Sequence, residues 1–224
     1  MPSNLEIFPS QSQSFFLSGP AGQLQCHIDY PQPLRDAAMR QGIVIVCHPH
    51  PLHGGTMTNK VVTTVARSFN HLGLPSIRFN YRGVGESAGS YGDTIGEAED
   101  LRAILTWIQT HRPDYPIYLA GFSFGTVVVS RVAMNPVIKQ LLLIAPPVNH
   151  YDFTSLPKPV CPRFVVIGEV DEVVPCKEVE AWVEVAKPQP KLITVEETSH
   201  FFHSKLITLK DIIVTHYQPL IVEL

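Results

Sequence analysis

The sequence is poor in charge and has no cluster of charge of one sign. Asp, Glu, Lys and Arg make up 17% of its 224 residues and the formal net charge is −3. The usual charged share of a globular protein is ~25%. No run of Lys or Arg is present, so the composition argues against a nucleic-acid groove or an anionic membrane surface. We expect neither nucleic acid nor membrane as a partner.

Long apolar runs are also missing. No stretch approaches the roughly 18 apolar residues that a membrane-spanning helix needs. The N-terminus, MPSNLEIFPSQSQ, has no basic start and no continuous apolar segment, so no secretory signal peptide is predicted. A cytoplasmic location is the default expectation.

Cysteine is scarce, and internal repeats, low-complexity tracts and long linkers are absent. The four cysteines, at positions 26, 47, 161 and 176, show no C-x-x-C spacing and are interpreted as small apolar core residues. Hydrophobic residues make up 45% of the chain, enough for one large core. We therefore expect a single domain spanning residues 1–224.

Short β-branched runs alternate with segments of helical periodicity. Strands are predicted in a hairpin within 5–30 and at 42–47, 74–81, 117–120, 139–145, 163–167 and 191–196. Helices are predicted at 58–72, from 94 to before 113, and at 124–134, 177–185 and 205–220. This alternation predicts an α/β fold with a doubly wound, mostly parallel sheet and an antiparallel N-terminal edge hairpin. In such sheets the chemistry collects at the carboxyl ends of the strands.

The segment Gly121-Phe-Ser123-Phe-Gly125 follows one of these strands and precedes a helix. It matches the G-x-S-x-G pattern, in which a serine stands on a sharp strand-to-helix turn. Glycine on either side relieves the crowding of that turn because it has no Cβ. The free N–H groups at the helix start favour an oxyanion. Ser123 is thus a candidate nucleophile.

A base and an acid follow later strands. His200 and His203 come after the last strand, and we favour His200 as the base because it lies earlier, in the loop. Glu169, Asp171 and Glu172 follow the preceding strand, and Asp171 is the best candidate because a short side chain has a more fixed geometry. The order Ser, Asp, His distinguishes this arrangement from other serine triads.

A second oxyanion donor should come from the loop His48-Pro-His50-Pro-Leu-His53-Gly-Gly. Proline has no N–H, so the first free amide after His48 belongs to His50. We predict that the backbone N–H groups of His50 and Phe124 form the oxyanion hole. The three histidines also suggest a metal site. We favour a rigid loop and expect no metal, because no nearby Cys or carboxylate completes a ligand set.

The loop from Gly83 to Ala88 fits G-x-G-x-x-[GA], a dinucleotide fingerprint. No helix opens directly on it, so a tight structural loop is the preferred interpretation and no cofactor is expected. Arg82 either pins this loop through a carboxylate or carbonyl groups, or faces a substrate carboxylate.

Taken together, HPHPLHGGTMTNK, FNYRGVGESAG, GFSFG, GEVDEVVP and SHFF resemble the α/β-hydrolase superfamily over essentially the full chain. The likeness is greatest to small, lidless bacterial members related to dienelactone hydrolases and prolyl-peptidase-like hydrolases. It implies Ser123 as nucleophile, Asp171 and His200 as its partners, and ester hydrolysis. Dienelactone hydrolases use a cysteine where this chain has Ser123, so their substrate is not implied.

The family often inserts a cap domain after the strand at 139–145, but only residues 146–162 lie before the next strand here. We expect no cap and an open, shallow site lined by Leu52, Tyr81, Phe122 and Phe201, with Phe124, Tyr151 and Phe153 also shaping it. The expected function is a serine hydrolase acting on small or accessible carboxylic esters. A peptidase or amidase, a non-catalytic binding protein and a nucleotide-binding protein stay open as alternatives.

Overall fold

A computed structural model describes residues 7–32 and 39–222 of the chain. Its strands are β1 (Gln13–Gly19), β2 (Gly22–Asp29), β3 (Ile43–Cys47), β4 (Ser76–Phe79), β5 (Ile117–Phe122), β6 (Ile138–Ile144), β7 (Arg163–Gly168) and β8 (Lys191–Val195). Its α-helices are α1 (Lys60–His71), α2 (Ile95–His111), α3 (Phe124–Arg131), α4 (Cys176–Val185) and α5 (Leu206–Val222), and a 3₁₀ turn, η1, spans Pro51–His53.

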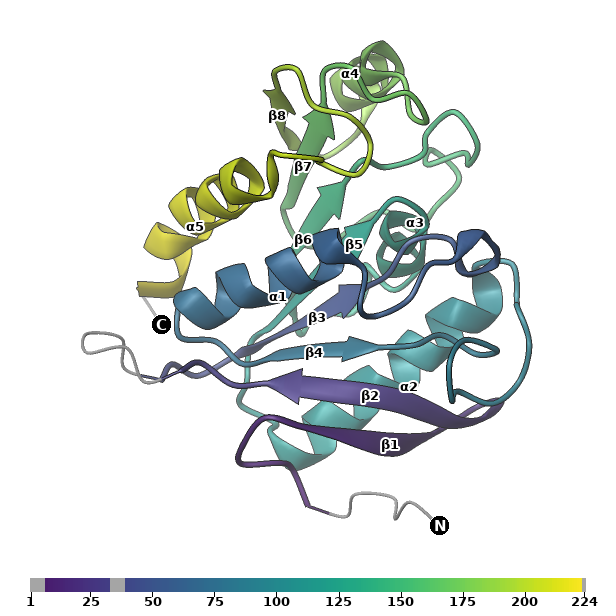
Figure 1. Cartoon of the computed structure of the whole chain (residues 1–224), viewed down its shortest axis with the longest axis vertical. Coiled ribbons are helices and arrows are strands. Elements are labelled where there is room, and N and C mark those ends of the chain that lie inside the picture. The colour runs from purple at the N-terminus through teal and green to yellow at the C-terminus, as the bar shows by residue number, and fades with distance from the viewer. Residues whose placement is uncertain (1–6, 33–38, 223–224) are drawn as a thin grey trace.

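One eight-stranded sheet runs through the molecule in the order β1-β2-β4-β3-β5-β6-β7-β8 (Figure 1). β2 pairs antiparallel with both β1 and β4. From β4 to β8 in the order of the sheet, all neighbouring strands pair parallel. The predicted edge hairpin and mostly parallel sheet are confirmed. The continuous apolar runs of β3 and β5 are buried along their whole length, as expected for strands covered on both faces.

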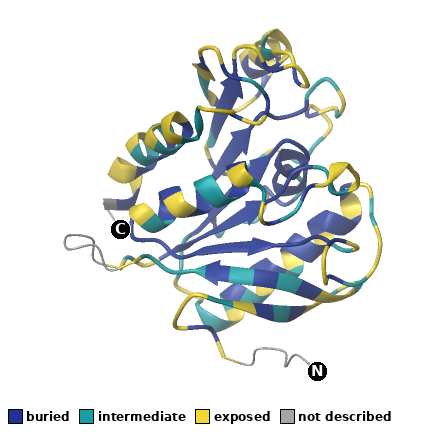
Figure 2. Cartoon of the chain, viewed as in Figure 1, coloured by how far each residue is buried: buried dark blue, intermediate teal, exposed yellow. Residues whose placement is uncertain are grey.

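Helices cover the two faces of this sheet. α1 and α5 lie side by side, whereas α2 packs against α3 and passes behind β1, β2 and β4 in the view of Figure 1. Figure 2 shows the central strands buried and the outward sides of α1, α4 and α5 exposed. The core therefore consists of the sheet and the inward faces of its helices.

The predicted helix at 124–134 is too long at its C-terminal end. α3 ends at Arg131, and the N–H of Val132 turns to bond the carbonyls of Val129 and Ser130. Pro136 follows a few residues later and could not continue a helix, since it lacks an N–H. The other predicted elements are found within a few residues of their expected bounds.

The connection from β6 to β7, residues 145–162, contains no helix. The expectation of no helical cap after β6 is confirmed. Among the residues that the structure describes, no helix is long and apolar enough to cross a membrane.

Candidate active site

Ser123 stands on the turn between β5 and α3 with the strained backbone that the motif predicts. Its φ and ψ are 51° and −120°, in a region that non-glycine residues rarely adopt. Glycine is required at positions 121 and 125 because backbone atoms of other residues lie close to both. A Cβ at Gly121 would lie 2.3 Å from the carbonyl oxygen of Gly125, and one at Gly125 would lie 2.4 Å from that of Cys47. The turn thus fits only because both positions lack a side chain.

His200 links Ser123 to Asp171. Its Nε2 lies 3.1 Å from the Ser123 hydroxyl oxygen, and its Nδ1 lies 2.8 Å from Oδ2 and 3.1 Å from Oδ1 of Asp171. A carboxylate only accepts hydrogen bonds, so Nδ1 carries the proton and donates, and the Ser123 hydroxyl donates to Nε2. All three residues are buried. The arrangement permits transfer of the serine proton to an imidazole held in one tautomer.

The alternatives to Asp171 and His200 take other places. Glu172 accepts a hydrogen bond from the backbone N–H of His200 at 3.1 Å, and Glu169 accepts one from the N–H of Glu197 at 3.0 Å. His203 is exposed to solvent. The loop after β7 therefore supplies one carboxylate to the imidazole ring and two that hold the loop after β8.

Asp171 is itself fixed by its own loop. Its Oδ1 accepts hydrogen bonds from the backbone N–H groups of Val173 and Val174, at 2.9 and 2.7 Å. A Cβ at Gly168, where β7 ends, would lie 2.2 Å from the carbonyl oxygen of Thr198. This close approach brings the loop after β7 against the loop that carries His200.

Of the two predicted oxyanion donors, Phe124 directly follows Ser123 in the chain, and His50 lies beside Phe124 in the fold. Phe124 begins α3, and the first N–H groups of a helix have no intrahelical acceptor. The His50 ring packs 4.8 Å from the Phe124 ring, which places the loop after β3 beside the helix start. The His50 carbonyl, in contrast, accepts hydrogen bonds from the N–H groups of His53 and Gly55 and so closes the loop on itself.

The three histidines of this loop have different environments. His48 is fully buried, donates from Nδ1 to the Pro49 carbonyl at 2.7 Å and accepts at Nε2 from the Tyr81 N–H at 3.2 Å. Burial lowers the pKa of His48 to about 3, so this ring is neutral. The rings of His50 and His53 stack on each other at 4.4 Å. Within the described part of the chain, no group of His, Cys, Asp or Glu is arranged to hold a metal.

The four predicted pocket residues divide into two pairs. Leu52, on η1, and Phe201, whose ring lies 5.1 Å from that of His200, are 65% and 41% exposed. Tyr81 and Phe122 have no exposed surface, so the prediction that they line an open pocket is wrong. Both lie at the carboxyl ends of strands that are buried along their whole length, where the Tyr81 ring packs 4.0 Å from that of His48 and the Phe122 ring lies 5.1 Å from that of His200.

Two tyrosines complete the surroundings of the site. The Tyr91 ring lies 5.4 Å from His50 and 6.1 Å from Phe124, and the Tyr151 ring lies 6.2 Å from Phe124. Tyr91 was not among the site residues expected from the sequence. It follows the glycine-rich loop after β4, and its position near a carboxyl end of the sheet was the available signal.

Arg82 pins the glycine-rich loop. Its guanidinium binds Asp100 of α2 at 2.8 Å, and Glu99 at 3.1 Å, so the interpretation as a structural anchor is confirmed. The Gly83 N–H donates to the Ala88 carbonyl, and the Ala88 N–H donates to the Gln23 carbonyl of β2. No helix opens on the loop, because α2 begins only at Ile95. The arrangement is not that of a dinucleotide-binding turn.

The chain matches a known protein family. The family model described as serine aminopeptidase, S33 matches residues 38–159. Protein RP471 of Rickettsia prowazekii is 32% identical over 200 residues, which cover 85% of this chain and 82% of that protein.

Solved structures share the whole fold. The structure of XC6422 from Xanthomonas campestris, described as a serine hydrolase without a lid, is 40% identical, with a TM-score of 0.92 over 97% of this chain and 98% of that one. A serine hydrolase homologue from Coxiella burnetii is 42% identical, with a TM-score of 0.87 over 93% and 99% of the two chains. The chain therefore belongs to the α/β-hydrolase superfamily, in the family of hydrolases described as serine aminopeptidase, S33.

Proposed function

We propose that the chain hydrolyses small or accessible carboxylic esters through an acyl-enzyme. The observation that carries the proposal is the continuous hydrogen-bonded link from the Ser123 hydroxyl through His200 to Asp171, at 3.1 and 2.8 Å. This link joins side chains that follow three separate strands, and it places a proton acceptor, Nε2 of His200, at the Ser123 hydroxyl.

The first half of the reaction uses the link to move one proton. The Ser123 oxygen bonds to the ester carbonyl carbon while its proton passes to Nε2 of His200. The carbonyl oxygen becomes an oxyanion that accepts hydrogen bonds from the Phe124 and His50 backbone N–H groups. The tetrahedral intermediate then breaks its bond to the alcohol oxygen, which takes the proton from His200 and leaves.

The second half repeats the sequence with water. His200 removes a proton from water, the hydroxide oxygen bonds to the acyl carbon, and the bond to Ser123 breaks as His200 returns the proton. Asp171 keeps its charge throughout and stabilises the imidazolium that forms in each half. The carboxylic acid is released and the free enzyme is restored.

Accessible substrates are favoured by what surrounds Ser123. The connection between β6 and β7 forms no helical cover, and Leu52 and Phe201 stand exposed beside the site. Long acyl chains bind best where a large apolar surface encloses them. Esters of short or exposed acyl groups should therefore react faster than long-chain esters.

The test is turnover of p-nitrophenyl acetate together with labelling by a fluorophosphonate, mapped by mass spectrometry. Ser123→Ala should lower kcat by at least about a thousandfold and abolish labelling. Ser130→Ala is the matched control, because Ser130 is also buried on the α3 segment and its hydroxyl donates to the Thr126 carbonyl of the same helix. An active Ser123→Ala variant, or a label on another residue, contradicts the assignment.

Asp171 is tested by Asp171→Asn, which keeps the size of the side chain and removes its charge. We expect kcat to fall at least about a hundredfold with little change in KM, because the amide no longer stabilises the imidazolium. Glu172→Gln is the control, since an amide oxygen still accepts from the His200 N–H. Equal losses in both variants would mean that Asp171 only supports the loop.

A peptidase or amidase is the second candidate, favoured by the description of the matching family. The same residues would act and only the leaving group would differ. Alanine p-nitroanilide measured beside p-nitrophenyl acetate separates the two activities. If the folded protein reacts with neither substrate nor with the fluorophosphonate, the chain is a binding protein on a hydrolase fold.

A further inference from the structure

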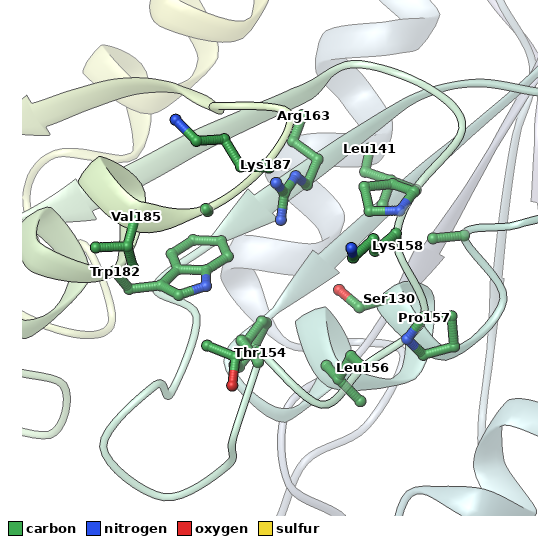
Figure 3. Close-up of a pocket in the computed structure, with 14 residues that line it drawn as sticks. Ser130, Leu141, Thr154, Leu156, Pro157, Lys158, Arg163, Trp182, Val185 and Lys187 are labelled. Carbon is green, nitrogen blue, oxygen red and sulfur yellow. The ribbon is translucent and has the colours of Figure 1, made fainter.

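A pocket lies away from Ser123, beside β6 and the start of β7. Figure 3 shows the residues that line it. Its volume is about 250 Å³, and it is enclosed by the end of α3, the start of β7, the end of α4 and the β6–β7 connection. Ser130, seven residues after Ser123 on α3, borders it. A helix rises 1.5 Å per residue, so the pocket begins roughly 10 Å from the nucleophile. No residue of the candidate active site lines it.

The residues that line this pocket carry charge of one sign. They include Lys158, Arg163 and Lys187, and no Asp or Glu. Figure 3 shows the Arg163 guanidinium pointing into the pocket next to the Trp182 ring. Cationic groups gathered without a carboxylate create a positive potential that favours an anion.

Arg163 lacks the carboxylate partner that the buried guanidinium groups of Arg78 and Arg82 have. Arg78 binds Asp29 and Arg82 binds Asp100, each at 2.8 Å. Among the described residues, no carboxylate lies within ion-pair distance of Arg163, and its buried Nε has no hydrogen-bond partner. One N–H donates to the Pro188 carbonyl, and no other hydrogen bond joins the five donors of Arg163 to the residues that the structure describes.

The pKa of Arg163 agrees with the lack of a carboxylate partner. Burial lowers the pKa of Arg163, as expected for a cation that has lost water without gaining an anion. A bound anion would supply the missing charge, and the planar guanidinium fork matches the two oxygens of a carboxylate.

The remaining walls are mostly apolar. Trp182 is 7% exposed, its ring lies 5.4 Å below the Arg163 guanidinium, and the Phe153 ring meets it edge-on at 5.2 Å. Leu141 and Leu156 lie on other sides of the pocket. Phe153 was expected at the active site, but it is buried here, because the β6–β7 connection folds toward α4.

We propose that this pocket binds a small organic carboxylate. The carboxylate lies on Arg163, within reach of the exposed Lys158 and Lys187 at the rim, and the apolar body lies against Trp182 and Leu156. The volume suits a ligand of about ten non-hydrogen atoms and is below the usual range of 300–1,000 Å³ for drug-sized ligands. Binding here does not require the proposed hydrolysis.

The test uses benzoate and the full-length ¹⁵N-labelled protein. The chain has two tryptophans, Trp107 and Trp182, so two indole N–H signals can be followed by NMR and assigned with Trp182→Phe. Benzoate should shift the Trp182 signal saturably and leave the Trp107 signal in place. Benzamide, which has the same shape without the charge, should bind at least about tenfold more weakly.

Two lysines form a matched pair of variants. Lys158→Gln removes an exposed charge that borders the pocket and should weaken benzoate binding at least threefold. Lys191→Gln removes a charge that borders Arg163 only from the neighbouring hollow, and should leave binding unchanged. Arg163→Gln should abolish binding. Repeating the titration in Ser123→Ala, with the same result, separates this pocket from the proposed active site.

Three outcomes of the ligand titrations would overturn the proposal. These are an unshifted Trp182 signal, benzamide binding as tightly as benzoate, or inorganic phosphate binding as tightly as benzoate. The last would show a simple anion site in which the apolar walls play no part. An effect of Lys191→Gln equal to that of Lys158→Gln would place the anion in the neighbouring hollow instead.

Discussion

At the scale of single residues, the candidate site depends on two glycines that have no Cβ. Gly121 and Gly125 permit the Ser123 turn because a Cβ at either position would lie within 2.4 Å of a backbone carbonyl oxygen. Backbone atoms move less easily than flexible side-chain ends. The cost of an added methyl group therefore falls on the turn itself and displaces the Ser123 hydroxyl from His200.

Gly125→Ala should lower both stability and activity. We expect a loss of about 1–3 kcal/mol in the free energy of unfolding, from overpacking against Cys47 and His48. Turnover should fall at least about tenfold even at temperatures where the variant is folded. Urea unfolding and p-nitrophenyl acetate kinetics measure the two effects. Ser130→Ala, on the same α3 segment, should change neither by much, and a fully active Gly125→Ala would refute the steric argument.

At the scale of elements, loops are tied to helices by buried charge. Arg82 starts the glycine-rich loop and Asp100 lies on α2, with side chains 12% and 0% exposed. The two oxygens of Asp100 accept from the backbone N–H and the guanidinium of Arg82, which fixes the loop that leads to Tyr91 beside the site. The position of the glycine-rich loop is therefore fixed by α2, the helix that follows it in the chain.

Asp100→Asn should be strongly destabilising, whereas Glu99→Gln should not. Removing one partner of a buried pair leaves an uncompensated charge and costs about 3–5 kcal/mol. Glu99 is 48% exposed and makes a single contact with Arg82, so its replacement should cost about 0.5 kcal/mol or less. Chemical denaturation of the two variants gives both values. Similar losses in the two would show that the pair contributes no more than a surface contact.

At the scale of the whole molecule, buried neutral histidine couples folding to pH. The His48 ring accepts a hydrogen bond from the Tyr81 N–H, and burial lowers its pKa from 6.5 to about 3. The unfolded chain therefore takes up a proton at higher pH than the folded chain. Between pH 6.5 and about 3, lower pH favours unfolding. His216, half-buried under Lys191, has its pKa lowered to about 4 and acts in the same direction.

Stability should fall as pH drops below 6.5, by up to about 1.4 kcal/mol per pH unit from His48 alone. His48→Gln should flatten this dependence, because the amide does not titrate. Urea unfolding between pH 7.5 and 4.5 provides the measurement, and His71→Asn, at an exposed position of α1, controls for the substitution itself. An unchanged slope in His48→Gln would refute the role of this ring.

The sequence alone determined the order of the elements, the sheet type and the serine turn. These follow from hydrophobic period, from β-branched runs and from glycine spacing, which act over a few residues. It also predicted Ser123, Asp171 and His200, because candidate side chains followed buried strands whose carboxyl ends share one edge. Their catalytic roles, and the single domain expected for the chain, stay predictions.

The tertiary structure decided which side chains from distant segments of the chain meet. Ser123 and His200 are 77 positions apart, and only the packing of the two loops shows which carboxylate reaches the imidazole. The same packing buries Tyr81 and Phe122 and leaves Arg163 without an ion pair to any carboxylate that the structure describes. A one-dimensional pattern places residues on strands and loops. Which groups then lose water, and against which partners, is settled only when the layers close around them.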